Sequence, residues 1–485
     1  MGKFNNKSVQ SRKTQTYEGG VAYKKQLEDE WTNMLFSFML QSGNHGFYRT
    51  VDEAQSRYIE LTNQMIEKYG PAFVGKAAIF ARNELGMRTI SELTAAMLNG
   101  VQFEGKREFY SKYFHRPDGI GEVFGAIDSL GMKRSHALVR GVCDYLETLS
   151  AYQIGKYPMK NHTYNMHDII NICHPKSENI DKYQKGILEK PDTWEVSIHS
   201  KHGQEREQEW KRLVEEKKLG YLALIRNLRN ILNCEFVKIP WIEEFLVPQI
   251  VNETAIKKSL VFPYQIYTAY KALDVVIPLE IEIALSEAFK LAIGNMPELP
   301  GKSCVVLDVS GSMESRMSKN NALTIKEVCA VYAAALYSSD KFDCDFIKFG
   351  TRAAYFSNTY KNISIFKLIK LMANNDSMGY GTEIKAVFNI LNEHYDRIFL
   401  FSDMQVMDPN PWYGNAAYQM FDEYKKIYGD SKIYSFDLGN YATQIVSDRQ
   451  DLVYITALND VVFKIIEMLE DPKKSLIDIV KNYEV

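Results

Sequence analysis

The feature that most constrains the fold is a change in hydrophobic periodicity near residue 295. From about residue 22 to residue 295, apolar residues recur with a period near 3.6 in segments separated by Gly, Pro or Asn. After a Pro- and Gly-rich stretch at residues 294–301, short apolar runs alternate with amphipathic segments. The first pattern predicts helices, and the second predicts a mainly parallel sheet with helices on both faces.

Within this pattern, individual elements have clear limits. Helices are predicted at residues 56–68, 72–83, 91–98, 120–130, 135–149, 204–218, 221–232 and 279–293. In the second part, strands are predicted at residues 303–309, 344–349, 397–402, 432–437 and 452–456, with helices at residues 322–337, 363–372, 418–428 and 461–469. Short loops between the early helices favour stacked, HEAT-like pairs, although no fixed repeat period is present.

These patterns predict three regions. Residues 1–21 are polar and basic and are expected to be a disordered arm. Residues 22–295 are expected to form the helical HEAT-like module, and residues 301–485 a doubly wound, Rossmann-like α/β domain. A chain of 485 residues exceeds the size at which single cores stop growing, which agrees with several domains.

The composition is that of an ordinary globular protein, with 46% hydrophobic and 25% charged residues. No run approaches the roughly 18 apolar residues of a membrane span, and the N-terminus lacks the apolar core of a secretory signal. We therefore expect a cytoplasmic protein. The 6 cysteines are scattered singly, without CxxC pairs, so reduced and mostly buried thiols are expected.

Net charge gives little guide to function. Residues 1–300 contain 38 Lys+Arg and 37 Asp+Glu, a balance of +1, whereas residues 301–485 contain 20 and 24, a balance of −4. A nucleic-acid site would therefore have to be a local basic patch.

Oxygen-bearing side chains follow two of the predicted strands. Asp308, Ser310 and Ser312 come at spacings of two residues just after one strand, and Asp403 ends another. Thr382 lies between them in a glycine-flanked loop before a helix. In open α/β sheets ligands bind at the carboxyl ends of strands, and hard oxygen donors suit Mg²⁺, which keeps several waters. The sequence therefore predicts a divalent metal site, most simply for Mg²⁺.

This order of motifs resembles the metal-ion-dependent adhesion site of von Willebrand factor A domains, and all five positions of that site are filled. The resemblance implies that Ser310, Ser312 and Thr382 coordinate the metal directly, while Asp308 and Asp403 act directly or through water. Only two carboxylates then balance the ion. An open coordination position would attract the acidic side chain of a partner.

The helical part resembles the TROVE module of the Ro autoantigen family and its bacterial relatives. The resemblance is carried by FMLQSGNHGFY at residues 38–48, ARNELGMRT at 81–89, HDIINICHPK at 167–176 and ALIRNLRN at 223–230. It implies a helical ring closed by the C-terminal domain. It also implies binding of small noncoding Y RNAs on an outer basic surface, passage of single-stranded ends of misfolded RNA through the ring, and an exoribonuclease as a partner.

A candidate RNA-binding segment lies at residues 156–167, which interleave Lys, His and aromatic side chains before the sequence His-Pro-Lys at 174–176. This mixture suits phosphate contacts and base stacking. In the family, basic residues before this helix and a histidine at its end contact RNA, which implies Lys156 or Lys160 together with His174. Lys176 completes the candidate set. The alternative is that residues 156–167 form a solvated, Lys-rich loop that does not bind RNA. A zinc site is disfavoured because the histidines lack a Cys partner.

No common motif for an NTPase, hydrolase, zinc peptidase or dinucleotide-binding enzyme is present. Asp308 and Asp403 alone are too few carboxylates for a two-metal nuclease. We therefore expect no intrinsic catalysis. Two hypotheses remain open: an RNA-binding scaffold in RNA quality control or nuclease tethering, and a metal-dependent module that recruits an acidic protein partner.

Overall fold

The computed structural model describes most of the chain. It covers residues 13–15, 21–24, 51–84, 86–157, 159, 163–198, 201–273, 276–316, 323–357, 360, 363–403, 416–437, 443–444, 451–455, 462–470 and 476–484. Across these residues, every helix is too short or too polar to cross a membrane. Most of the predicted disordered arm lies outside the described residues, but residues 13–15 within it form a strand.

The chain forms two compact units. Unit 1 comprises Met1–Leu61 and Gln249–Glu470, and unit 2 comprises Thr62–Pro248 and Asp471–Val485. These units differ from the regions expected from periodicity, because the last helices before the sheet belong to unit 1 and the C-terminal segment belongs to unit 2. The division into a helical region and an α/β region at residues 295–301 stays a prediction.

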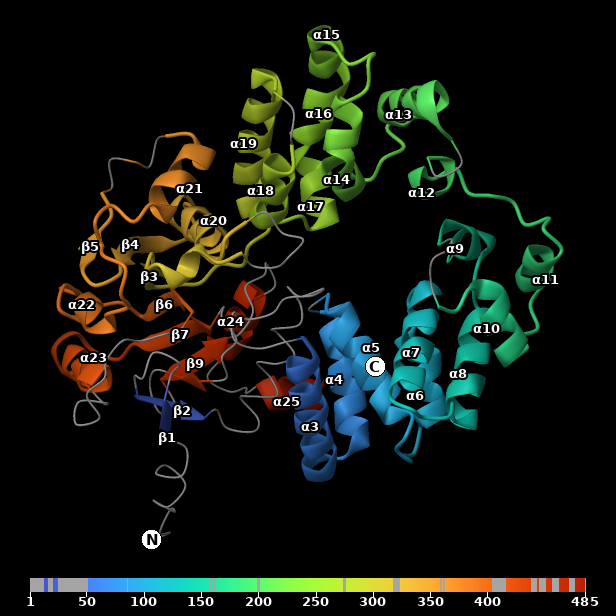
Figure 1. The fold of residues 1–485 in the computed structure, drawn as a ribbon, viewed down its shortest axis with the longest axis horizontal. Coiled ribbons are helices and arrows are strands. Elements are labelled where there is room, and N and C mark those ends of the chain that lie inside the picture. The colour runs from blue at the N-terminus through green and yellow to red at the C-terminus, as the bar shows by residue number, and fades with distance from the viewer. Residues whose placement is uncertain are drawn as a thin grey trace. The chain divides into compact units, whose positions relative to one another are not determined.

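Unit 2 is helical (Figure 1). Its helices are α3 (Val51–Tyr69, shared with unit 1), α4 (Pro71–Asn83), α5 (Arg88–Leu98), α6 (Lys106–Tyr113), α7 (Asp118–Ser129), α8 (His136–Glu147), α9 (Ala151–Lys156), α10 (Met166–Cys173), α11 (Glu178–Gln184), α12 (Trp194–Ser197), α13 (Gly203–Glu215), α14 (Tyr221–Leu232), α15 (Ile239–Trp241), a π-helical turn (Ile242–Leu246) and α16 (Val247–Ile250, shared with unit 1). Neighbours pack in pairs, including α4 with α5, α6 with α8 and α13 with α14. A Cβ at Gly141 would lie 2.5 Å from the carbonyl of Arg107, so glycine permits the close approach of α6 and α8.

The C-terminal segment packs within unit 2. Helix α25 (Leu476–Lys481) contacts α4, where the ammonium of Lys76 donates to the carbonyl of Lys481 at 3.0 Å. The ring of Tyr483 meets Phe80 edge to face at 5.2 Å between centroids. The apolar burial of this tail was not expected, because its sequence follows the α/β domain directly.

Unit 1 contains three further helices before its sheet. These are α17 (Glu253–Ser259), α18 (Pro263–Lys271) and α19 (Leu279–Ile293). The side-chain amide of Asn295 donates to the carbonyls of Ile256 at 3.1 Å and Val261 at 2.6 Å, which links the end of α19 to α17. A small antiparallel sheet joins β1 (Lys13–Gln15), β2 (Val21–Lys24) and β8 (Thr443–Gln444).

The main sheet of unit 1 has 6 strands in the order β5-β4-β3-β6-β7-β9, all parallel except the edge strand β5. The strands are β3 (Lys302–Asp308), β4 (Asp343–Phe349), β5 (Ala353–Tyr355), β6 (Arg397–Ser402), β7 (Lys432–Asp437) and β9 (Leu452–Ile455). Counted along the domain, this is the 3-2-1-4-5-6 order of doubly wound sheets. The predicted fold class is confirmed.

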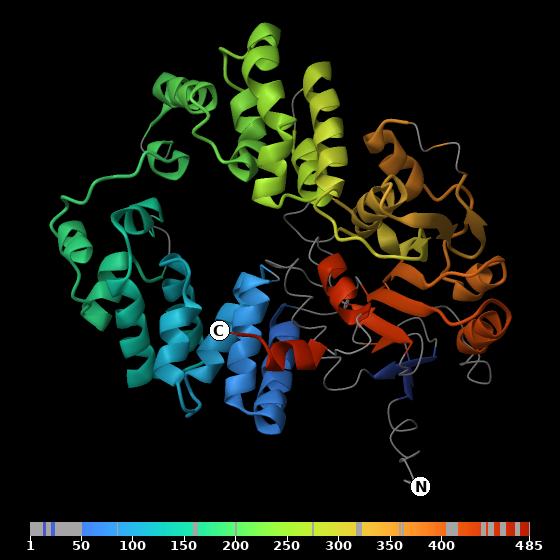
Figure 2. The same ribbon diagram turned by 180° about the vertical axis from the view of Figure 1, so that it is seen from behind.

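Helices cover both faces of this sheet (Figures 1 and 2). They are α20 (Ile325–Tyr337), α21 (Ile365–Ala373), α22 (Ile384–Phe388), α23 (Ala416–Tyr428) and α24 (Val462–Glu470). Successive strand residues face opposite sides. Val306 belongs to a core with Val387 of α22 and Phe421 of α23, whereas Phe399 meets Phe463 of α24 at 6.0 Å on the other side. Burial on both faces explains the nearly continuous apolar runs of β3 and β6.

The 6 cysteines are all buried thiols, as expected.

Candidate metal centre and candidate RNA surface

The two predicted carboxylate ligands lie at the carboxyl ends of neighbouring strands. Asp308 is the last residue of β3, and Asp403 directly follows β6. The register pairs Leu307 with Phe401, so the two strands end side by side. The strand order reverses between β3 and β6, which is where ligands bind in doubly wound folds. Asp308 is 0% exposed and Asp403 is 1% exposed.

The three predicted hydroxyl ligands form a connected row beside Asp308. The Oγ atoms of Ser312 and Ser310 lie 3.3 Å apart, and the Oγ1 of Thr382 lies 3.2 Å from that of Ser310. Thr382 Oγ1 is also 3.4 Å from Oδ2 of Asp308. Adjacent ligands around Mg²⁺, with bonds of roughly 2.0–2.1 Å at right angles, are about 3 Å apart. The row therefore fits one side of an octahedral shell with only small adjustments.

Asp308 is held by hydrogen bonds from neutral donors. Its Oδ1 accepts the amide of Ser310 at 2.9 Å, and its Oδ2 accepts the hydroxyl of Ser402 at 2.7 Å. Burial raises the pKa of Asp308, and the hydrogen bonds from Ser310, Ser402 and Thr382 only partly oppose this rise. None of these partners is a basic side chain. A divalent cation would supply the missing positive charge.

The charges of Asp308 and Asp403 both act on one buried thiol, that of Cys329. Burial raises the pKa of Cys329 in α20, and the negative charges of Asp308 and Asp403 both raise it further. This agrees with the register, in which β3 and β6 end side by side.

The loop that carries Thr382 is fixed by two glycines that permit close contact between backbones. A Cβ at Gly350 would lie 2.4 Å from the carbonyl oxygen of Gly379, and a Cβ at Gly379 would lie 2.6 Å from Oγ1 of Thr351. Gly379 also has a φ of 88°, which favours glycine. The amide of Glu383 donates to the carbonyl of Gly350 at 2.9 Å, which fixes the position of Thr382 beside β4.

The donor set fits a hard divalent ion. Five oxygen-bearing side chains from three separate segments meet at one edge of the sheet, and they include two carboxylates. Gly311 is exposed and Ser312 is half-buried, so one side of the row faces solvent. Waters or a carboxylate from another molecule could complete the shell there. Ser402 is a further member that the sequence did not single out.

Of the three candidate RNA residues that the structure describes, Lys156 is the one placed among aromatic rings. It ends α9, and its Nζ lies 5.3 Å from the ring centroid of Tyr152 and 5.6 Å from that of Tyr157. Tyr152 is 51% exposed, so an amphipathic, cationic surface is open to solvent there. Lys160 lies outside the described residues.

His174 and Lys176 lie together in the connection between α10 and α11. His174 caps α10 in a left-handed conformation, with φ 51° and ψ 50°, and its amide donates to the carbonyl of Ile170 at 2.8 Å. The backbone amide of Lys176 donates to Oε1 of Glu147 at 2.8 Å. Both side chains are exposed. A non-glycine residue held in this conformation is uncommon and presents the imidazole outward from a fixed turn.

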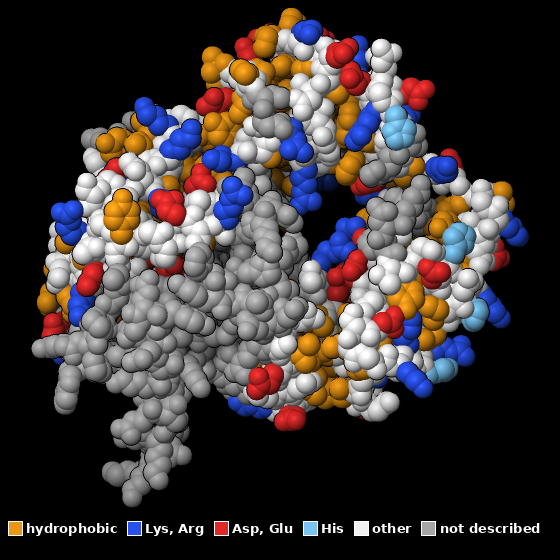
Figure 3. All heavy atoms as spheres, viewed as in Figure 1, with side chains coloured by type: hydrophobic (Ala, Val, Ile, Leu, Met, Phe, Trp, Pro, Cys, Tyr) orange, Lys and Arg blue, Asp and Glu red, His pale blue; other side chains and the backbone are white. Residues whose placement is uncertain are grey.

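Arg116 adds a cation that the sequence did not indicate. Its guanidinium lies 4.3 Å from the ring centroid of Tyr157 and forms an ion pair of 2.7 Å with Asp118. Arg116 is about forty residues from Tyr157 in sequence, so only the packing of the helices connects them. Figure 3 shows Lys, Arg and His side chains where α8, α10 and α11 lie, interspersed with acidic ones.

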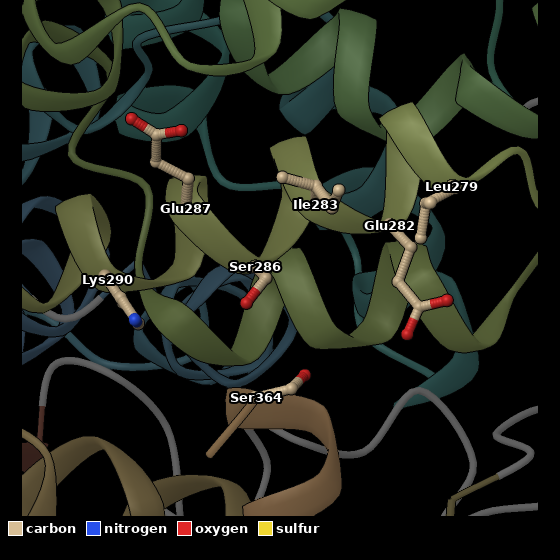
Figure 4. Close-up of a pocket in the computed structure, with 7 residues that line it drawn as sticks. All are labelled: Leu279, Glu282, Ile283, Ser286, Glu287, Lys290 and Ser364. Carbon is tan, nitrogen blue, oxygen red and sulfur yellow. The ribbon is translucent and has the colours of Figure 1, made fainter. Parts of the chain in front are cut away.

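A groove of about 440 Å³ along α19 is separate from both sets of residues. It is lined by Leu279, Glu282, Ile283, Ser286, Glu287, Lys290 and Ser364 (Figure 4). Leu279 and Ile283 are 65% and 56% exposed. None of the candidate metal or RNA residues lines this groove, and we assign it no function.

Together, the fold and the candidate site define a class: a helical module followed by a doubly wound α/β domain with five oxygen-bearing side chains near its switch point. The family model of the TROVE domain matches residues 182–282. The crystal structure of the Ro (Rsr) protein of Deinococcus radiodurans has the same fold, with a TM-score of 0.63 and 14% identity over 91% of this chain and 100% of that chain. A search of curated proteins gives no match. Residues 182–282 therefore match the TROVE domain model, and the chain shares the fold of a bacterial Ro protein.

Proposed function

We propose that this protein is an RNA-binding scaffold for small noncoding, Y-like RNAs and for misfolded RNA with single-stranded ends. The observation that carries the proposal is the TROVE match at residues 182–282 within a chain that shares its fold with a Ro protein over 91% of its length. Exposed His174 and Lys176, and Lys156 among aromatic rings, supply chemistry suited to phosphates and bases.

We further propose that the scaffold acts in the cytoplasm, in RNA quality control or by tethering RNA to an exoribonuclease, and that it has no catalytic activity of its own. The oxygen site would hold one Mg²⁺ through Ser310, Ser312 and Thr382, with Asp308 and Asp403 binding directly or through water. When bound, the ion would neutralise the buried carboxylates and offer an open position to a partner. This role is supported by the spacing of the hydroxyl row.

The first test is binding of the purified full chain to a structured RNA with a single-stranded tail, compared with the same RNA without the tail. Binding should prefer the tailed RNA and weaken steeply as salt rises, because phosphate contacts release counterions. The RNA should remain intact in Mg²⁺. Metal-dependent cleavage that is lost in Asp308→Ala would instead make the protein an enzyme.

The alternative is a metal-dependent protein-binding module with no RNA role. The observation that favours it is the net charge of −4 of residues 301–485. A net negative charge repels a polyanion such as RNA more strongly than it repels a single carboxylate on the metal. A protein captured by the wild-type chain and lost with Asp308→Ala, with no RNA recovered, would favour this module over the scaffold.

A further inference from the structure

Tyr380 is the most exposed aromatic residue that the structure describes in unit 1. It is 83% exposed and lies two residues before the proposed ligand Thr382. A single exposed aromatic side chain is common on protein surfaces and is not itself a site. Two further properties of this residue, its fixed backbone and its position beside the proposed metal ligands, distinguish it.

The backbone around Tyr380 is held from both sides. The carbonyl of Tyr380 accepts the amide of Gly311 at 3.2 Å, and the next amide, of Gly381, donates to Oγ1 of Thr351 at 3.2 Å. The side-chain amide of Asn375 donates to the carbonyl of Gly379 at 2.9 Å and to that of Val309 at 2.7 Å. Binding at a loop fixed in this way costs little backbone entropy, because only the side chain of Tyr380 has to be ordered.

The ring of Tyr380 stands against the loop that carries two proposed metal ligands. A Cβ at Gly311 would lie 3.7 Å from Cδ1 of Tyr380. Gly311 separates Ser310 from Ser312 in sequence, so the ring borders the solvent-facing side of the hydroxyl row. A group that reached the metal from solvent would pass beside this ring.

The charge of the surrounding sequence favours a protein partner over RNA. Residues 301–485 contain 20 Lys+Arg and 24 Asp+Glu. A net-negative domain repels a polyanion more strongly than it repels a segment with one carboxylate, and that carboxylate can bind a divalent cation.

We infer that Tyr380 is the apolar anchor of a docking surface for a protein segment that places an Asp or Glu on the metal. The residue beside that carboxylate would be apolar or proline, and it would pack on the ring of Tyr380. Tyrosine is among the residues that most often dominate the binding energy of interfaces, because its ring buries a large area with few rotatable bonds. This inference rests on the proposed metal site.

The experiment uses the full chain and fluorescent hexapeptides with a central Asp whose neighbours are varied among Leu, Pro, Phe, Lys and Ser. Binding is measured by anisotropy in Mg²⁺ and in EDTA for wild type, Tyr380→Ala, Tyr380→Phe and the control Tyr360→Ala. Calorimetry with Mn²⁺ measures metal binding by each variant separately. A single-stranded RNA of mixed sequence is tested in parallel.

We expect Mg²⁺-dependent binding that prefers apolar or proline neighbours, a loss of about tenfold in Tyr380→Ala, and near wild-type binding in Tyr380→Phe and Tyr360→Ala. Metal affinity should be unchanged in all three variants. Equal peptide binding by Tyr380→Ala, or no peptide binding by a wild-type chain that does bind metal, would overturn the inference. So would Mg²⁺-dependent binding of the RNA in place of the peptides. If the wild-type chain binds no metal, the proposed metal site itself fails, and calorimetry identifies that case.

Discussion

The hydroxyl of Ser402, the last residue of β6, donates a 2.7 Å hydrogen bond to Oδ2 of Asp308, the last residue of β3. Both side chains are fully buried. The bond joins the two strands on either side of the switch point. It also fixes the direction in which Asp308 presents its carboxylate to the hydroxyl row.

Replacing Ser402 by Ala should weaken metal binding by about tenfold without abolishing it. Hydrogen bonds to charged groups contribute about 1.5–3 kcal/mol, and the remaining donors to Asp308 would still hold it in place. Calorimetric titration with Mn²⁺ measures the change. Ser435→Ala removes another buried hydroxyl from the same sheet and should bind metal as wild type does. A Ser402→Ala variant with unaltered Mn²⁺ affinity would show that Ser402 does not position Asp308 for metal binding.

Mg²⁺ should raise the melting temperature of the wild-type chain and leave that of Asp308→Asn unchanged. A ligand at a hundred times its Kd stabilises the folded state by about 2.7 kcal/mol, whereas a chain that cannot bind gains nothing. In EDTA, Asp308→Asn should be as stable as wild type or more so, because the variant has no buried charge to desolvate. Asp430→Asn, on the surface of the same domain, is the control and should respond to Mg²⁺. A full Mg²⁺ response in Asp308→Asn would contradict the site.

Gly350→Ala should lower the unfolding free energy by about 2 kcal/mol and weaken metal binding at the same time. The new Cβ would lie 2.4 Å from the carbonyl oxygen of Gly379, so the loop that carries Thr382 would have to move. Urea denaturation and Mn²⁺ calorimetry report the two effects.

Gly125→Ala is the matched control. A Cβ there meets nothing within 4 Å, and Gly125 lies inside α7, so alanine should stabilise the chain by up to about 1 kcal/mol. If Gly350→Ala behaved like Gly125→Ala, the close approach of the two loops would not position Thr382.

Much of the fold could be predicted because local periodicity and burial agree. The strands predicted at residues 397–402 and 432–437 coincide with β6 and β7, and the helix predicted at residues 279–293 coincides with α19. The edge strand β5 was not predicted, because three residues carry too little periodicity. Helix α22, of five residues, lies where a helix was expected after the loop of Thr382, although the sequence did not indicate its limits.

The candidate site was only partly predictable. Motif spacing indicated the five candidate oxygen ligands, because each one lies at the end of a strand or in a loop. Spacing could not indicate Ser402, which reads as an ordinary strand residue, or Arg116, whose approach to Tyr157 depends on helix packing. The sequence also could not indicate that residues 476–484 pack on α4, because the pattern of a short amphipathic segment does not show which helix it contacts.

The stability of unit 2 should depend on the ionisation of Glu209 in α13. Hydrogen bonds from Arg212 lower the pKa of Glu209 to about 2, against burial, and Lys201 assists. A lowered pKa stabilises the fold at any pH above the ordinary value of 4.5, and that stabilisation is lost as the pH falls from 4.5 towards 2. Between pH 6 and pH 3, wild type should therefore lose about 1–2 kcal/mol more than Glu209→Gln in urea denaturation. Parallel losses in the two proteins would show that the Glu209 pair does not contribute.

Charge reversal of Lys156 and Lys176 together should weaken binding of a tailed RNA and reduce its salt dependence. Each phosphate contact that is lost lowers the slope of log K against log salt by about 1. Filter binding over a range of salt concentrations measures both quantities. Lys112→Glu, on the exposed face of α6, is the control and should change binding little. Unaltered binding by the double reversal would move the RNA site elsewhere on the protein.

The most direct test of the central claim is sequencing of the RNA that co-purifies with the full chain from its native cells. We expect recovery of a few small structured noncoding RNAs, and of misfolded RNAs with single-stranded ends, that are depleted when Lys156 and Lys176 are reversed in charge. Recovery of no RNA above the level of an unrelated protein of similar charge, together with a protein lost on Asp308→Ala, would contradict the RNA scaffold.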